Sequence, residues 1–121
     1  MGNMSRATAA ATLLRVFDAV VKEFNRDCPV NQPWAFLKVA SAGSGGMDQA
    51  RLQNDMELSS AGISRLVQAL SKVSYQKDRE GFDVVERRFD ALDNRSRSIV
   101  LTPKGERVLN RLIDVLTGEK R

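Results

Sequence analysis

Histidine is absent from this 121-residue chain, and cysteine occurs only once, as Cys28. A single cysteine excludes an internal disulfide, and a zinc site would need several cysteine or histidine ligands. Without histidine the chain also lacks the usual proton carrier of neutral-pH catalysis. Cys28 could serve as a redox switch, but a lone cysteine beside Pro29, with no neighbour that would lower its pKa, is more often a small hydrophobic residue.

Long apolar runs are also missing, so no segment is predicted to span a membrane. The N-terminal residues 1–10 lack the apolar core of a signal peptide, and Arg6 stands where a myristoylation signal has Ser or Thr. The glycines at 43–46 are not followed by the Lys-Ser/Thr of a phosphate-binding loop. We therefore expect a cytoplasmic protein without enzyme activity, cofactor, metal or membrane partner.

The composition that is present fits one globular domain, residues 1–121. An apolar fraction of 42% suffices for one modest core, and 28% charged residues is ordinary for a soluble surface. The net charge of +4 favours a polyanionic partner without establishing one, because many proteins are this basic. The position of the charges is therefore more informative than their sum.

Apolar residues recur at helical spacing in most of the chain. The spacing predicts helices over residues 5–25, 34–42, 47–55, 60–73 and 103–117. Ser5, Ser59 and Thr102 are placed to cap three of them, and Gly118 is placed to end the last. Trp34 and Phe36, at the start of the second helix, are most simply core residues.

Residues 82–89 and 97–102 are rich in β-formers and are joined by the turn sequence DALDNRS. This pattern predicts a hairpin, and the polar residues 74–81 before it read as a loop. The fold class that we predict is mainly α with a two-stranded β wing.

The helices over 47–55 and 60–73 are separated by a tight turn, which is the helix-turn-helix arrangement. The apolar stripe of the second helix must face the core, so its polar side faces outward. Hydroxyl, amide and cationic side chains there can hydrogen-bond base edges and phosphates in a major groove. They are Ser60, Ser64, Arg65, Gln68 and Lys72. Any amphipathic helix has a polar outer face, however, so this helix alone does not decide the function.

The hairpin favours DNA binding further, because basic residues on a turn that follows such a helix describe a wing. Arginine in a wing is attracted by the negative potential of the minor groove. The candidate residues are Arg87, Arg88, Asn94, Arg95, Arg97 and Lys104. Asp93 lies two residues from Arg95 and is placed to orient its guanidinium or to cap the turn. The alternative is an exposed hairpin whose charges only provide solubility.

Two segments carry a resemblance to a known family, LSSAGISRLVQAL (58–70) and VERRFDALDNRSRSIVLTPKGERVL (85–109). They resemble the MarR family of bacterial winged-helix regulators. The matching positions are Leu58, Ser59, Ile63, Ser64, Arg65, Leu66, Val67, Leu70, Val85, Arg87, Asp93, Arg95, Leu101, Thr102 and Gly105. The chain departs from the family pattern in a longer connection between the helix and the wing, and in being shorter at the C-terminus.

The resemblance implies a dimeric DNA-binding regulator, with the recognition helix in the major groove, the wing in the minor groove and the terminal helices forming the dimer. We assign residues 47–102 to the DNA-binding lobe, and residues 5–27 and 103–117 to dimerisation. The apolar stripes of these helices supply the candidate interface, Leu14, Phe17, Val21, Phe24, Leu112, Ile113 and Leu116.

These inferences predict a sequence-specific regulator of transcription, in the form of a homodimeric repressor of double-stranded DNA. Ser60, Ser64, Arg65 and Gln68 are the candidate base readers, and Arg95 and Arg97 are the wing contacts. Arg87, Arg88, Lys72 and Lys104 are expected to neutralise phosphates. The alternative is a winged-helix interaction module that docks on a transcription component without reading DNA.

Overall fold

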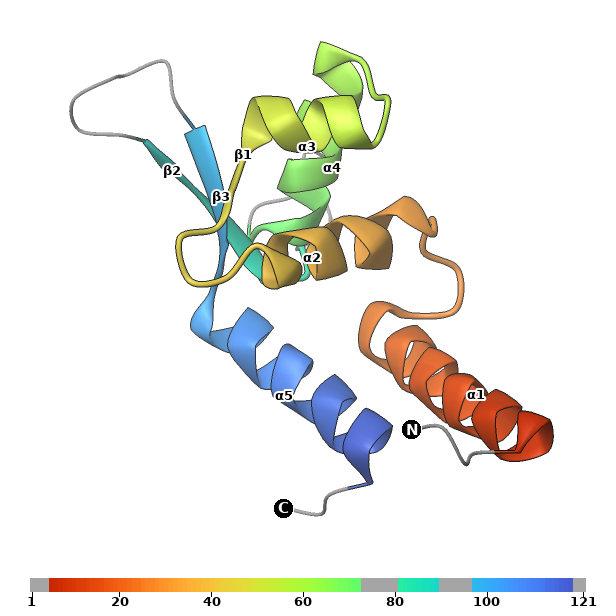
Figure 1. The fold of residues 1–121 in the computed structure, drawn as a ribbon. Coiled ribbons are helices and arrows are strands. Elements are labelled where there is room, and N and C mark those ends of the chain that lie inside the picture. Colours follow the sequence, from red (N-terminus) through yellow and green to blue (C-terminus); the bar gives the residue numbers. More distant parts are fainter. Residues whose placement is uncertain (1–4, 73–80, 90–96, 119–121) are drawn as a thin grey trace.

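The computed structural model describes residues 5–72, 81–89 and 97–118 (Figure 1). The helices are α1 (Arg6–Phe24), α2 (Asn31–Ser41), α3 (Gln49–Asp55), α4 (Ser60–Leu70) and α5 (Pro103–Thr117), and the strands are β1 (Met47–Asp48), β2 (Val85–Phe89) and β3 (Arg97–Leu101). The strands form an antiparallel sheet in the order β1-β3-β2, beside α2, α3 and α4. Helices α1 and α5 lie together at the other end of the molecule. Within the described ranges, no helix combines the length and the apolar character that crossing a membrane requires.

The three predicted helix caps are confirmed. The Ser5 hydroxyl accepts a hydrogen bond from the Thr8 backbone N–H at 3.1 Å, and the Ser59 hydroxyl accepts one from Gly62 at 2.9 Å. Thr102 caps α5 in the same way, and Gly118 ends that helix in the left-handed conformation. Each cap satisfies a backbone N–H that the first helical turn leaves without a partner.

Thr102 also joins α5 to the start of the hairpin. Its Oγ1 accepts a hydrogen bond from the Gly105 N–H at 3.0 Å and donates one to the Asp83 carbonyl. A Cβ at position 105 would collide with the Val84 carbonyl oxygen. The close approach of helix and strand therefore requires both the threonine and the glycine of the TPKG sequence.

The helix predicted to run to residue 73 ends at Leu70, and the strand predicted to begin at Phe82 begins at Val85. Both differences have one cause. The N–H groups of Phe82 and Val84 donate to the carbonyls of Ala69 and Leu70, at 3.0 and 2.8 Å. Residues just before β2 thus satisfy the last carbonyls of α4, which fastens the base of the hairpin to that helix.

A third strand was not predicted. Met47 and Asp48 pair with Ile99 and Ser98 of β3, so the helix expected from residue 47 begins at Gln49. Gly46 makes this pairing possible, because it has a φ of 76° and a Cβ there would collide with the Ile99 carbonyl oxygen. The second helix also starts earlier than predicted, at Asn31 instead of residue 34.

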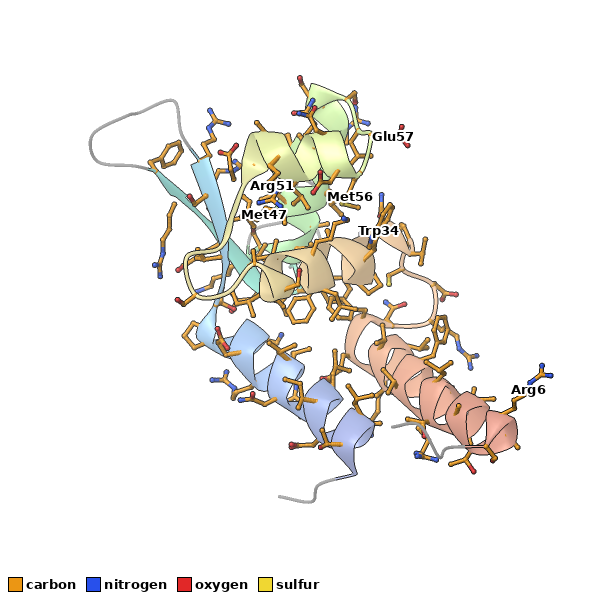
Figure 2. The ribbon with its side chains drawn as sticks, in the orientation of Figure 1. Arg6, Trp34, Met47, Arg51, Met56 and Glu57 are labelled. Atoms are coloured by element: carbon orange, nitrogen blue, oxygen red, sulfur yellow. The ribbon has the colours of Figure 1, made fainter. Side chains whose placement is uncertain are left out.

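The core lies between α2, α4, the sheet and the ends of α1 and α5. Phe24 stands with its ring centroid 5.3 Å from those of both Phe36 and Phe82. Phe36 is a core residue as predicted, but Trp34 is 47% exposed. Trp34, labelled in Figure 2, projects from α2. The Lys38 ammonium stands 5.6 Å from the centre of its ring. Helical periodicity explains the difference, because Trp34 lies across the helix from Phe36.

Candidate nucleic-acid interface

The two sides of α4 differ completely in character. Its apolar residues Ile63, Leu66, Val67 and Leu70 are all at most 4% exposed. Ser60 and Arg65 are exposed, and Ser64 and Gln68 are half-buried on the same outward side. Lys72 follows the helix end and is exposed. The structure thus brings the candidate base readers together on one helix face.

Arg65 extends from the middle of this face. It has no hydrogen bond or ion pair with any residue in the described part of the chain. Its side chain lines a hollow of about 240 Å³ next to Asn31 and Gln32, at the start of α2. Among the described residues none occupies its five N–H donors, which can therefore serve an acceptor outside the protein.

Helix α4 and the hairpin share a surface. A hollow of about 380 Å³ lies between α4 and β2. Gln68 and Lys72 line it from the helix side, and Glu86 and Arg87 line it from the strand side. The polar side of α4 and the described part of the hairpin therefore face the same space, as a groove-binding arrangement requires.

The hairpin arginines fall on two faces of the sheet, because strand residues alternate. Arg88 points away from the core, is largely exposed, and forms an ion pair of 2.8 Å with Glu86. Arg97 is exposed and pairs with Phe89 at the end of β2 nearest the hairpin turn. Its guanidinium carbon stands 5.5 Å from the centre of the Phe89 ring. Asp93, Asn94 and Arg95 lie outside the described residues.

Arg87 lies on the core face of the sheet and is half-buried. Its Nε donates a hydrogen bond of 2.9 Å to Gln49 Oε1, at the start of α3. Its Nη2 is buried and has no hydrogen-bond partner among the described residues. Burial, and secondarily the charge of Arg97, lower the pKa of Arg87. The phosphate contact stays a prediction, and this position disfavours it because Nη2 is buried and Nε is already bonded to Gln49.

Lys104 is exposed in the first turn of α5. That turn follows the end of β3 that is away from the hairpin turn (Figure 1). Lys104 therefore follows the end of β3 opposite to Arg97. Cys28 is half-buried between α1 and α2, and burial raises the pKa of its thiol. A raised pKa lowers the thiolate fraction at neutral pH and argues against a redox role.

The terminal helices pack on each other through a link between Arg111 of α5 and Glu23 of α1. The Arg111 Nε and Nη2 donate to the two Glu23 carboxylate oxygens at 2.9 and 3.1 Å. Of the candidate interface residues, Phe24 and Leu112 are buried in the core at 1% and 5% exposure. They are therefore not available to a second chain. Val21 is half-buried, and the exposed members are Leu14, Phe17, Ile113 and Leu116.

Two residues were missed by sequence reasoning, one beside the hairpin and one on α1. Gln49, the partner of Arg87, is 38 positions away from it, and no local signal connects the two residues. Leu13 is the most exposed large apolar residue of α1, at 69%. The helical spacing did contain that signal, because Leu13 lies one turn before Phe17.

No protein-family model matches the sequence, and no curated protein matches it significantly. Solved structures do match. The MepR–DNA complex of S. aureus is 16% identical with a TM-score of 0.67, over 91% of this chain and 80% of that one. A MarR-family transcriptional regulator from Rhodococcus sp. RHA1 is 21% identical with a TM-score of 0.58, over 92% and 69%. A MarR-like regulator from Thermotoga maritima is 19% identical with a TM-score of 0.60, over 96% and 81%.

At these identities the match establishes the fold. The chain has the winged helix-turn-helix fold of MarR-family transcriptional regulators, with α3 and α4 as the helix-turn-helix and β2 and β3 as the strands of the wing.

Proposed function

We propose that this chain, which has the MarR-type fold, is a sequence-specific regulator of transcription that binds double-stranded DNA as a homodimer and acts as a cytoplasmic repressor. The observation that carries the proposal is the shared surface of α4 and the hairpin. Arg65 is exposed there and has no partner among the described residues. Gln68, on the same side of α4, and Lys72, just after it, line a hollow together with Glu86 and Arg87 of β2. A structurally similar protein, MepR, has been solved in complex with DNA.

In this proposal α4 enters the major groove. Arg65 can form two hydrogen bonds with O6 and N7 of a guanine, and the Gln68 amide can do the same with an adenine. Ser60 and Ser64 add short hydroxyl groups nearer the start of the helix. The hairpin reaches the neighbouring minor groove with Arg97, together with Asn94 and Arg95 from the segment outside the described residues, and Asp93 orders that segment.

Phosphate contacts are assigned to Lys72 and Arg88, which are exposed on the helix and hairpin sides. The ion pair between Arg88 and Glu86 does not prevent this role, because an exposed pair contributes little stability and can be exchanged for a phosphate. Lys104, at the far end of β3, is a weaker candidate for the same role.

Dimerisation is proposed through the exposed apolar side chains of the terminal helices, Leu13, Leu14, Phe17, Ile113 and Leu116. A two-fold dimer would present two α4 helices to a palindromic site. Recognition helices of such dimers contact half-sites about 34–36 Å, or one helical turn, apart. We therefore expect the DNA site to be palindromic.

The test is selection of bound sequences from a random duplex pool, followed by a salt titration on the selected duplex. We expect a palindromic consensus, and an affinity that falls linearly on logarithmic axes with a slope of about 0.9 per phosphate contact. The Arg95→Ala variant should bind more weakly and show a shallower slope. An unchanged titration for that variant would remove the wing from the mechanism.

A second candidate function, docking on a partner protein, is supported by exposed apolar residues on α2. The outer side of α2 exposes the apolar residues Val30, Trp34 and Leu37, at 73%, 47% and 41%. Such a row can receive a partner protein, which fits a winged-helix module that docks on a transcription component without reading DNA. Failure to bind mixed duplex DNA even at low salt would favour this alternative.

A further inference from the structure

We propose that Arg87 is a positioning residue, which holds the wing hairpin against the first helix of the helix-turn-helix through Gln49 and so fixes the wing relative to α4. Its consequence for DNA binding depends on the function proposed above. The role differs from a phosphate contact, because Arg87 acts through another residue of the protein.

The sheet register carries Arg87 toward Gln49. Arg87 on β2 is opposite Ile99 on β3, and Ile99 is opposite Met47 on β1. The three residues form one row across the sheet, and Ile99 and Met47 are buried. Neighbouring strands lie about 4.8 Å apart, so the row spans about 10 Å. A long arginine side chain crosses Ile99 on this face and meets Gln49, which follows β1 by one residue.

Arg87 directs two of its guanidinium nitrogens into the protein. Its Nε is occupied by the 2.9 Å hydrogen bond to Gln49, and its Nη2 is buried. Burial and the nearby Arg97 lower the pKa of Arg87, which marks a guanidinium that is partly removed from water. A group used for phosphate contact would instead be exposed, as the next residue Arg88 is.

The hairpin is fastened to the helices at its base through the Val84–Leu70 hydrogen bond. Strand β1 pairs with β3 and not with β2. The link between Arg87 and Gln49 is therefore a second attachment of β2, three residues nearer the turn than Val84. Two attachments along one strand resist pivoting about its base, which would otherwise move the wing tip relative to α4.

The experiment compares duplex affinities, each over a range of salt, for the wild-type chain and the variants Arg87→Gln, Gln49→Ala, Gln49→Glu and Arg87→Gln with Gln49→Ala. We expect Arg87→Gln and Gln49→Ala each to weaken binding to the selected duplex about 10-fold, and the double variant to be no weaker, because both remove one interaction. The salt slope should stay at the wild-type value. Gln49→Glu keeps an acceptor for Arg87 and should keep near-wild-type affinity.

Arg88→Gln is the matched control. It removes the neighbouring exposed cation, so it should make the salt slope shallower, which Arg87→Gln should not do. Thermal unfolding of all variants shows whether they fold. The same data give the interaction free energy between positions 49 and 87, which is the stability change of the double variant minus the sum for the two single variants. A nonzero value shows that the link exists without DNA.

Two results would overturn the positioning role. One is a shallower slope for Arg87→Gln, which would make Arg87 a phosphate contact. The other is an unchanged affinity for Gln49→Ala. Failure of the wild-type chain to bind any duplex would instead reject the proposed function itself, and with it the DNA consequence of the link.

Discussion

Helices α4 and α1 are both amphipathic and both begin with a serine cap, but they use their outer sides in opposite ways. All four large apolar residues of α4 are buried, and its outer side is polar. Helix α1 leaves Leu13, Leu14 and Phe17 exposed at 69%, 59% and 62%. The proposed function uses this difference, since a polar face suits nucleic acid and an exposed apolar face suits a second protein surface.

The surroundings of the two helices explain this difference. Helix α4 is enclosed by α2, α3 and β2, which together cover its apolar stripe. Helix α1 packs on α5 and touches α2 near its end, where Phe24 enters the core. The apolar residues in the first half of α1 have no such cover within the described part of the chain. Variants on the two helices should therefore affect different measurements.

The largest effect on folding is expected for Ile63→Ala. Ile63 is 1% exposed, and removing it from the core of α4 should lower the free energy of unfolding by about 2–5 kcal/mol. Chemical denaturation measures this loss. Ala61→Ser, on the exposed side of the same helix, is the control and should change stability by about 0.5 kcal/mol or less. Equal losses would show that α4 has no buried side.

The double substitution Leu14→Glu with Phe17→Glu should affect association. Charges on this face oppose burial against a second chain, and each substitution occurs twice in a two-fold dimer. We expect the dimer dissociation constant, measured by sedimentation equilibrium, to rise about 100-fold or more. Lys22→Glu, an exposed change in the last turn of α1, should leave it within a few-fold. An unchanged dimer in the double variant would place the interface elsewhere.

The two serine caps offer a smaller and direct comparison. Ser59→Ala should lower stability by about 1 kcal/mol, because the first turn of α4 is held in the packed lobe. Ser5→Ala should cost only a few tenths of a kcal/mol, since the start of α1 is exposed and its loss can be absorbed by fraying. Thermal unfolding of both variants measures the difference. A larger loss for Ser5→Ala would contradict the contrast drawn between the helices.

Local signals predicted much of the fold. The caps at Ser5, Ser59 and Thr102 and the helical spacing around them gave three helix starts correctly, because capping depends on residues only three positions apart. Strand β1 was missed, because two residues have no periodicity and Met47 and Asp48 become a strand only by pairing with Ile99 and Ser98.

The candidate site could also be predicted only where local sequence signals determine it. The outward face of α4 followed from its periodicity, and the structure places Arg65 and Gln68 on it. Arg87 and Arg88 could not be distinguished, because a strand sends neighbouring side chains to opposite faces and only the tertiary fold decides which face is covered. The burial of Phe24 likewise depends on Phe36 and Phe82, which belong to other elements.

The central claim is that the outer side of α4 reads the bases of a duplex. The most direct measurement is the affinity of Arg65→Ala for the selected duplex and for a scrambled duplex of the same length, at one salt concentration. We expect a loss of binding free energy of about 1–3 kcal/mol on the selected duplex and a clearly smaller loss on the scrambled one. Equal losses on both duplexes, or none on either, would contradict it.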